Sequence, residues 1–167
     1  MVLAWYSMRA TLEFATSGAS LVSANGYVQR DAESGACIRS AGVLLLSDGC
    51  TSTWDVGYNV GTCMMDLNIL GQHGVISLDD FVLDWADGFA INTPGNPVGF
   101  IQRSGVANPT DFKKITTVSD QPQVVCMIDH FIALTADPNG RKARDSIRIS
   151  EQTQGLLDAV WNELTTI

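Results

Sequence analysis

The sequence lacks the short motifs that mark nucleotide-binding, hydrolytic and zinc-dependent sites. Its 167 residues contain no GxGxxG, no GxxxxGK followed by Ser or Thr, no GxSxG and no HExxH. A phosphate cradle, an activated serine and a helical zinc site each depend on one of these spacings. By these signals the chain has no nucleotide site, no metal site and no hydrolytic site of its own.

Basic residues are scarce: Lys+Arg 10 against Asp+Glu 18 give a formal net charge of -8. A nucleic-acid-binding surface needs a basic patch. The one short basic cluster is interpreted as a solvated loop before the last helix, and an anion site is the alternative; the cluster comprises Arg141, Lys142, Arg144 and Arg148. Long hydrophobic runs are also missing, since no stretch approaches the ~20 apolar residues of a membrane span. We therefore expect no nucleic-acid partner and no membrane span.

Cysteine is also scarce, with four copies that stand singly. No CxxC and no Cys/His pair at metal-ligand spacing occurs, so we expect reduced, buried, inert thiols. Such usage favours a reducing compartment, the cytoplasm or the interior of an organelle. Four is an even number, and a cross-strand disulfide, Cys37–Cys50 or Cys50–Cys63, is the alternative.

Two histidines and one pair of aspartates are the residues that first suggest proton chemistry. His73 lies in a turn between glycines, and His130 lies beside Asp129 in a helical stripe. Neither has a Cys or Ser nearby in sequence to activate. Asp79 and Asp80 are adjacent in a predicted strand, so their side chains point to opposite faces. We expect none of these residues to be catalytic.

Hydrophobic residues make up 46% of the chain, enough for one domain with a core. Helical spacing predicts a helix over residues 3–15, and its apolar stripe is Leu3, Tyr6, Ala10 and Phe14. Strand-like runs separated by turn residues follow up to about residue 83, with Asp48-Gly49 as a hairpin turn. Two more short strands are expected near residues 99–103 and 113–118, on either side of loop segments.

Near the end of the chain the apolar residues again recur about every 3.6 residues, which predicts two closing helices. One follows Pro122 and includes Phe131, and the other starts near Ser150 and includes Trp161; both aromatic residues are expected in the core. A helix, a run of hairpin-linked strands and two closing helices indicate a single α+β domain over residues 1–167. Its predicted form is a mostly antiparallel open β-sheet with helices packed on one face.

An open sheet with helices on one face exposes its other face. In residues 50–58 the alternation places Trp54, Val56 and Tyr58 on the same side. Large aromatic groups are typical anchors of interfaces. We therefore predict that these three residues form an interface, either in a homo-oligomer or with another subunit of a larger complex.

Residues 67–85, LNILGQHGVISLDDFVLDW, resemble the GxxGxLxxxDF stretch in the C-terminal domain of the Gfo/Idh/MocA oxidoreductases. The branch that includes dihydrodiol dehydrogenase and related plant enzymes is the most similar. LAWYSMRA looks like the family's DxGWYxxRA helix, and LLLSDGCTSTWDVGYN looks like its hairpin. Residues 121–135 and 146–164 resemble its closing helices. The resemblance follows the order of the family over nearly the whole chain.

The resemblance implies that a Rossmann domain, which holds NAD(P) in that family, would come before this part. None of that domain is found in these residues, so we expect no cofactor in this chain and NAD(P) only if a Rossmann domain is supplied. Tyr6 matches the position where family members place a Tyr or His near the substrate, and it is the one candidate catalytic residue. Val2 and Ala4 stand where the family has Asp and Gly.

Two functions follow as hypotheses. The first is an oxidoreductase-derived domain without a cofactor site, which acts as a structural or assembly subunit through its open sheet face. The alternative is the C-terminal part of an NAD(P)-dependent oxidoreductase acting on a sugar, polyol or diol, completed by a Rossmann domain outside this chain.

Overall fold

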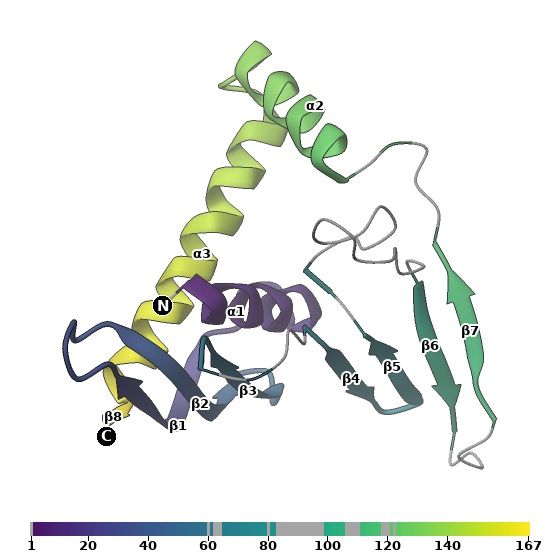
Figure 1. The fold of residues 1–167 in the computed structure, drawn as a ribbon. Helices are drawn as coiled ribbons and strands as arrows, with labels where there is room; N and C mark the ends of the chain where they lie inside the picture. The colour runs from purple at the N-terminus through teal and green to yellow at the C-terminus, as the bar shows by residue number, and fades with distance from the viewer. Residues whose placement is uncertain are drawn as a thin grey trace. The chain divides into compact units, whose positions relative to one another are not determined.

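The computed structural model describes residues 2–59, 61, 65–79, 81–82, 99–105, 111–117, 121 and 123–167. These residues form three helices and two four-stranded sheets, so the predicted α+β class is confirmed (Figure 1). The chain divides into two compact units. The first unit comprises Met1–Gly61 and Asp137–Ile167, and the second unit comprises Thr62–Ala136.

The first unit contains the opening helix, one sheet and the last helix. Its elements are α1 (Val2–Phe14), β1 (Leu21–Arg30), β2 (Cys37–Leu46), β3 (Thr51–Gly57), α3 (Arg141–Glu163) and β8 (Thr165–Thr166). The sheet order is β3-β2-β1-β8. β1, β2 and β3 are antiparallel to their neighbours, whereas β8 runs parallel to β1. The C-terminal residues therefore complete one edge of the sheet.

The turn between β2 and β3 is formed by the predicted Asp48-Gly49 pair. Gly49 has φ +85, in the left-handed region that glycine adopts without strain. The Asp48 carboxylate accepts the backbone N–H of Thr16 at 2.6 Å and that of Cys50 at 3.0 Å. These bonds hold the pKa of the Asp48 carboxyl below its usual range. One side chain thus ties the hairpin to the chain that follows α1.

The core of the first unit lies between the sheet and the two helices α1 and α3. α1 contacts β3 and α3, and α3 contacts β1. The buried apolar residues come from both helices and from β2 and β3; they are Ala4, Met8, Leu44, Leu46, Trp54, Leu156, Leu157 and Val160. The helices therefore cover one face of this sheet, as the sequence predicts.

The second unit contains β4 (Leu67–Gly71), β5 (Gly74–Leu78), β6 (Gly99–Ser104), β7 (Lys113–Thr116) and α2 (Gln123–Ala136). The sheet order is β4-β5-β6-β7, and every pair of neighbours is antiparallel. The turn between Gly71 and Gly74 and the strands near residues 99–103 and 113–118 are confirmed. The described strands are thus shared between two four-stranded sheets.

Two details of the predicted helices are wrong. α3 begins at Arg141, well before Ser150, so the basic cluster lies in its first turns and not in a loop. Asp145 lies 3.6 Å from both Arg141 and Arg148, which gives this polar part i,i+4 and i,i+3 ion pairs. Phe131 on α2 is 65% exposed and is not a core residue.

Trp161 is half-buried and lies outside the core, with the guanidinium of Arg30 placed 5.3 Å from its ring centroid. None of the cysteines within the described residues forms a disulfide bond. Cys37 and Cys50 are half-buried, but Cys126 is exposed, which corrects the prediction that all are buried; Cys63 lies outside the described residues.

None of the described helices has both the length and the apolar character of a membrane span.

Candidate functional site

Tyr6, the candidate catalytic residue, lies in the first half of α1. Its side chain is 39% exposed, and its ring meets the ring of Trp5 edge to face, with centroids 6.1 Å apart. Arg9 and Glu13 follow at i+3 and i+7, so they share a helix face with Tyr6. The phenol is therefore accessible at the surface of the first unit and is not enclosed in its core.

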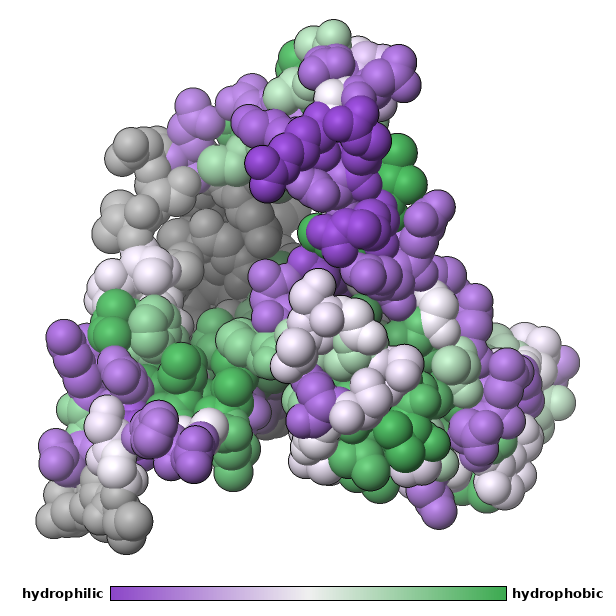
Figure 2. Space-filling model, turned by 180° about the vertical axis from the view of Figure 1, so that it is seen from behind, coloured by the Kyte–Doolittle hydropathy of each residue, from purple (hydrophilic) through white to green (hydrophobic). Residues whose placement is uncertain are grey.

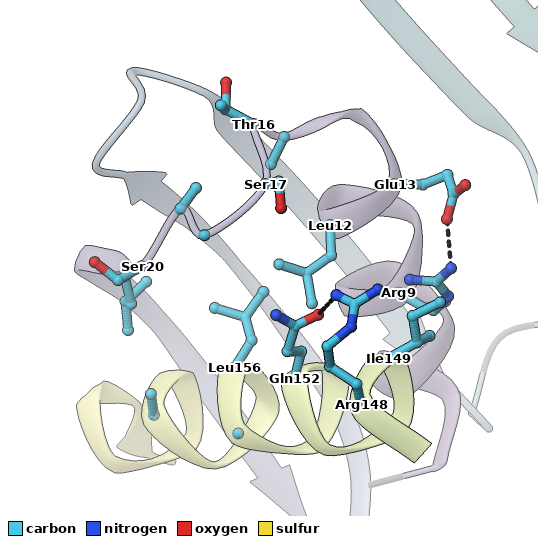
Figure 3. A pocket seen from close by; sticks show the side chains of 16 residues that line it. Arg9, Leu12, Glu13, Thr16, Ser17, Ser20, Arg148, Ile149, Gln152 and Leu156 are labelled. Atoms are coloured by element: carbon cyan, nitrogen blue, oxygen red, sulfur yellow. Dashed lines mark hydrogen bonds and ion pairs between the residues drawn. The ribbon is translucent and has the colours of Figure 1, made fainter. Parts of the chain in front are cut away.

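An open groove lies between the C-terminal part of α1 and the middle of α3 (Figure 3). Its volume is about 540 Å³, within the range of small-molecule sites. The segment 15–21, which links α1 to β1, closes a third side. Leu12, Ile149 and Leu156 give it an apolar floor, and Leu156 belongs to the core beneath.

The rim of this groove carries charged side chains from both helices. Arg9 forms an ion pair with Glu13 on α1. Arg148 on α3 donates from Nη1 to Oε1 of Gln152 at 3.2 Å. Arg148 belongs to the cluster that the sequence placed in a loop, so composition alone missed its position. The signal that could have found this position is the spacing i, i+4 and i+8, which places Arg148, Gln152 and Leu156 on one helix face.

The sheet face of the first unit that points away from the helices is mixed in character. Its polar side chains include Asn25, Thr53, Arg39 and Asp55, and its apolar side chains include Tyr27, Ala41, Val43 and Leu45. Arg39 donates from Nε and Nη2 to the two carboxylate oxygens of Asp55, at 3.1 and 2.7 Å. The bond to Asp55 raises the pKa of Arg39 further above its usual range.

The predicted interface residues Trp54 and Val56 do not lie on that outer face. Trp54 is 5% exposed in the core, and Val56 is half-buried against the same core. Placing these two residues at an open face is therefore wrong, because α1 and α3 cover their side of β3. Tyr58, just beyond β3, is 65% exposed. The role of Tyr58 in an interface stays a prediction.

One face of the sheet of the second unit carries most of its large apolar side chains. Cross-strand register places six of them on this surface, which we call the apolar face: Leu67, Ile69, Ile76, Leu78, Phe100 and Ile115. All six are only half-buried. Gln102, Ser104 and Lys113 lie on the same face, toward the far ends of β6 and β7. The opposite face carries Asn68, Ser77, Arg103 and Lys114 beside its apolar residues. Figure 2 shows hydrophobic residues at the surface over these strands.

The residues first considered for proton chemistry are not brought together. His73 lies in the turn between β4 and β5, and His130 lies on α2. Asp79 follows β5, and Asp80 lies outside the described residues. In the part of the chain that the structure describes, no group of three or more His, Cys, Asp or Glu could hold a metal ion.

No family model matches the sequence, and no curated protein matches it. Solved structures do match its fold. The 3-ketoreductase KijD10 from Actinomadura kijaniata, in complex with NADP, matches with a TM-score of 0.75 and 14% identity. The match covers 98% of this chain and 46% of that chain. The aldose-aldose oxidoreductase from Caulobacter crescentus, complexed with glycerol, matches with a TM-score of 0.61 and 14% identity, over 95% and 43% of the two chains.

The chain therefore spans less than half the length of these oxidoreductases. The likeness shows that its fold is that of the C-terminal domain of Gfo/Idh/MocA-type oxidoreductases, which the sequence resemblance predicts.

Proposed function

We propose that this domain is an oxidoreductase-derived assembly module that joins copies of itself through the apolar face of the second unit. The observation that carries the proposal is the set of six half-exposed apolar side chains on one face of β4–β7. A contiguous apolar surface of this kind is unusual on a monomer and marks an interaction site. A second copy presents the same face, so a two-fold arrangement buries both.

The cofactor of the ketoreductase does not fit the described residues of this chain. A dinucleotide site needs a strand that leads through a glycine-rich turn into a helix N-terminus. Here β1, β2 and β3 follow one another as antiparallel strands, and β4 pairs with β5 across a short turn. The proposed module therefore holds no nicotinamide cofactor itself.

The test uses two neighbouring residues of β5 that point to opposite sides of the sheet. Ile76 pairs with Ile69 and Gln102 on the apolar face, whereas Val75 pairs with Leu70 and Arg103 on the other face. Ile76→Lys is expected to reduce the molar mass of the assembly, because a charge cannot be buried there without a partner. Val75→Lys is the matched control and is expected to leave the mass unchanged.

Light scattering gives the molar mass of both variants, and circular dichroism checks that each remains folded. Equal masses for the two folded variants would contradict the use of the apolar face.

The alternative function is the substrate-side half of an NAD(P)-dependent oxidoreductase acting on a sugar, polyol or diol. The exposed Tyr6 on α1 favours it, because a phenol hydroxyl can donate a hydrogen bond to a substrate oxygen. This candidate needs a dinucleotide-binding domain from outside the chain.

The test of the alternative joins the chain to such a domain and follows the oxidation of NADPH with ketosugars. Tyr6→Phe is expected to lower kcat by tenfold or more, in the range of acid–base groups. Tyr58→Phe, which changes an exposed phenol elsewhere in the first unit, serves as control. An equal loss of kcat in Tyr6→Phe and Tyr58→Phe would contradict a role for Tyr6.

A further inference from the structure

We propose that the groove between α1 and α3 binds a small amphipathic carboxylate, an acid with a short apolar body. The site lies wholly within the first unit, and it is independent of the apolar face and of Tyr6. Three features carry the proposal: the apolar floor, a gap in α3 and two arginines at the rim.

The floor of the groove suits an alkyl or small aromatic body. Leu12 of α1 and Leu156 of α3 both point into it, and Ile149 extends the apolar surface along α3 (Figure 3). Ala15 and Ala19, which lie on the segment that closes the third side, have short side chains. Such a surface gains free energy when it is removed from water by an apolar group.

Gly155 lies in the middle of α3 and lines the groove. A Cβ built at this position would meet nothing within 4 Å, so a larger side chain has room and would occupy the groove. Glycine inside a helix destabilises the helix relative to alanine. The absence of a side chain at this point gives the groove part of its depth.

The rim supplies guanidinium donors from two helices. Arg9 and Arg148 both line the groove, and Figure 3 shows Arg9 turned toward Glu13 and Arg148 turned toward Gln152. Among the described residues, Arg9 bonds to Glu13 through Nη2, and Arg148 bonds to Gln152 through Nη1. Each guanidinium carries five N–H donors, so both retain donors for a ligand. A carboxylate accepts such donors in a strong, charge-assisted pair.

A single negative charge matches the site better than a double one. Glu13 and Asp145 lie beside the two arginines and offset part of their positive charge. The C-terminal end of α1, with its partial negative charge, also borders the groove. These groups favour a carboxylate over a phosphate dianion as the ligand.

The experiment titrates the full chain with hexanoate and follows backbone amide shifts by NMR. We expect saturable shifts confined to residues of α1, α3 and the segment 15–21. Acetate lacks the apolar body and hexanol lacks the charge, so each is expected to bind at least tenfold more weakly. Hexyl phosphate carries the same body with a second charge and is also expected to bind more weakly.

Two variants and one control locate the site. Gly155→Leu fills the groove and is expected to abolish the shifts. Arg148→Gln removes one cation and is expected to weaken hexanoate binding at least fivefold. Lys142→Gln removes an exposed charge of α3 outside the groove and is expected to leave the affinity unchanged. Circular dichroism checks the fold of each variant.

Any of four results would overturn the proposal. These are no saturable binding of hexanoate, equal binding of hexanol, tighter binding of hexyl phosphate, or unchanged binding in the folded Gly155→Leu or Arg148→Gln variant.

Discussion

Trp54 donates its indole N–H to the buried hydroxyl of Ser40 at 3.1 Å, across the pair formed by β3 and β2. Ser40 is 0% exposed, and Trp54 is 5% exposed. The bond satisfies two polar groups that would otherwise be buried without partners. It also links β3 to β2 on the inner face of the sheet, where both residues are buried.

The first prediction concerns this bond and the packing around it. Trp54→Ala is expected to lower the free energy of unfolding by about 3–5 kcal/mol, because it removes a large core side chain. Tyr58→Ala, which removes an exposed aromatic ring near the end of the same strand, is expected to change it by less than about 0.5 kcal/mol. Urea denaturation of both variants measures the difference. Comparable losses would show that Trp54 is not a core residue.

The second prediction concerns the glycine beneath the indole ring. A Cβ at Gly42 would lie 2.6 Å from Cζ2 of Trp54 and 2.5 Å from the backbone oxygen of Asn25. Gly42→Ala is therefore expected to destabilise the first unit by about 1–3 kcal/mol.

Gly155→Ala is the matched control, because a Cβ there has open space. It is expected to stabilise the chain by roughly 0.5–1 kcal/mol, since alanine favours the helix. Thermal melts compare the two changes. A melting temperature of Gly42→Ala that equals or exceeds that of the wild type would contradict the close contact with Trp54.

The third prediction concerns acid stability. The pKa of Asp48 is lowered in the folded chain, chiefly by the backbone N–H of Thr16 and then by that of Cys50. The ionised carboxylate of Asp48 therefore stabilises the fold at pH values above the pKa that Asp48 has in the unfolded chain. This stabilisation is lost as the pH falls through the lower folded-state pKa.

The free energy of unfolding is accordingly expected to fall less between neutral and acid pH in Asp48→Asn than in the wild type. Denaturant midpoints measured across this range test it. Parallel pH profiles for the wild type and the variant would show that the Asp48 carboxylate contributes nothing to the effect.

Much of the fold follows from local signals in the sequence. The first helix, the Asp48-Gly49 turn and the turn between Gly71 and Gly74 are each found where alternation and turn chemistry place them. These features depend on residues close in sequence, which is why periodicity predicts them. The α+β class follows from their order.

The side of the sheet that the helices cover could not be obtained in this way. Alternation in residues 50–58 shows that Trp54 and Val56 share a face, but both faces of an antiparallel strand have the same period. Only the packing of α1 against β3 decides that this face is the inner one. The interface predicted at Trp54 was wrong for this reason.

The groove was missed for a related reason. In the sequence, Arg148 stands out only as one of several neighbouring basic residues. Its proposed role in ligand binding depends on Arg9, which is far away in sequence and lines the same groove from α1. Tertiary contacts between two helices leave no local pattern. The apolar face of the second unit is recognisable only after the register of four strands is known.

The central claim is that the apolar face joins copies of this chain, and the molar mass of the wild-type chain in solution tests it most directly. Sedimentation equilibrium over a wide range of concentrations gives this mass. We predict at least twice the chain mass of 18.0 kDa. A mass of 18.0 kDa at every concentration would contradict the claim.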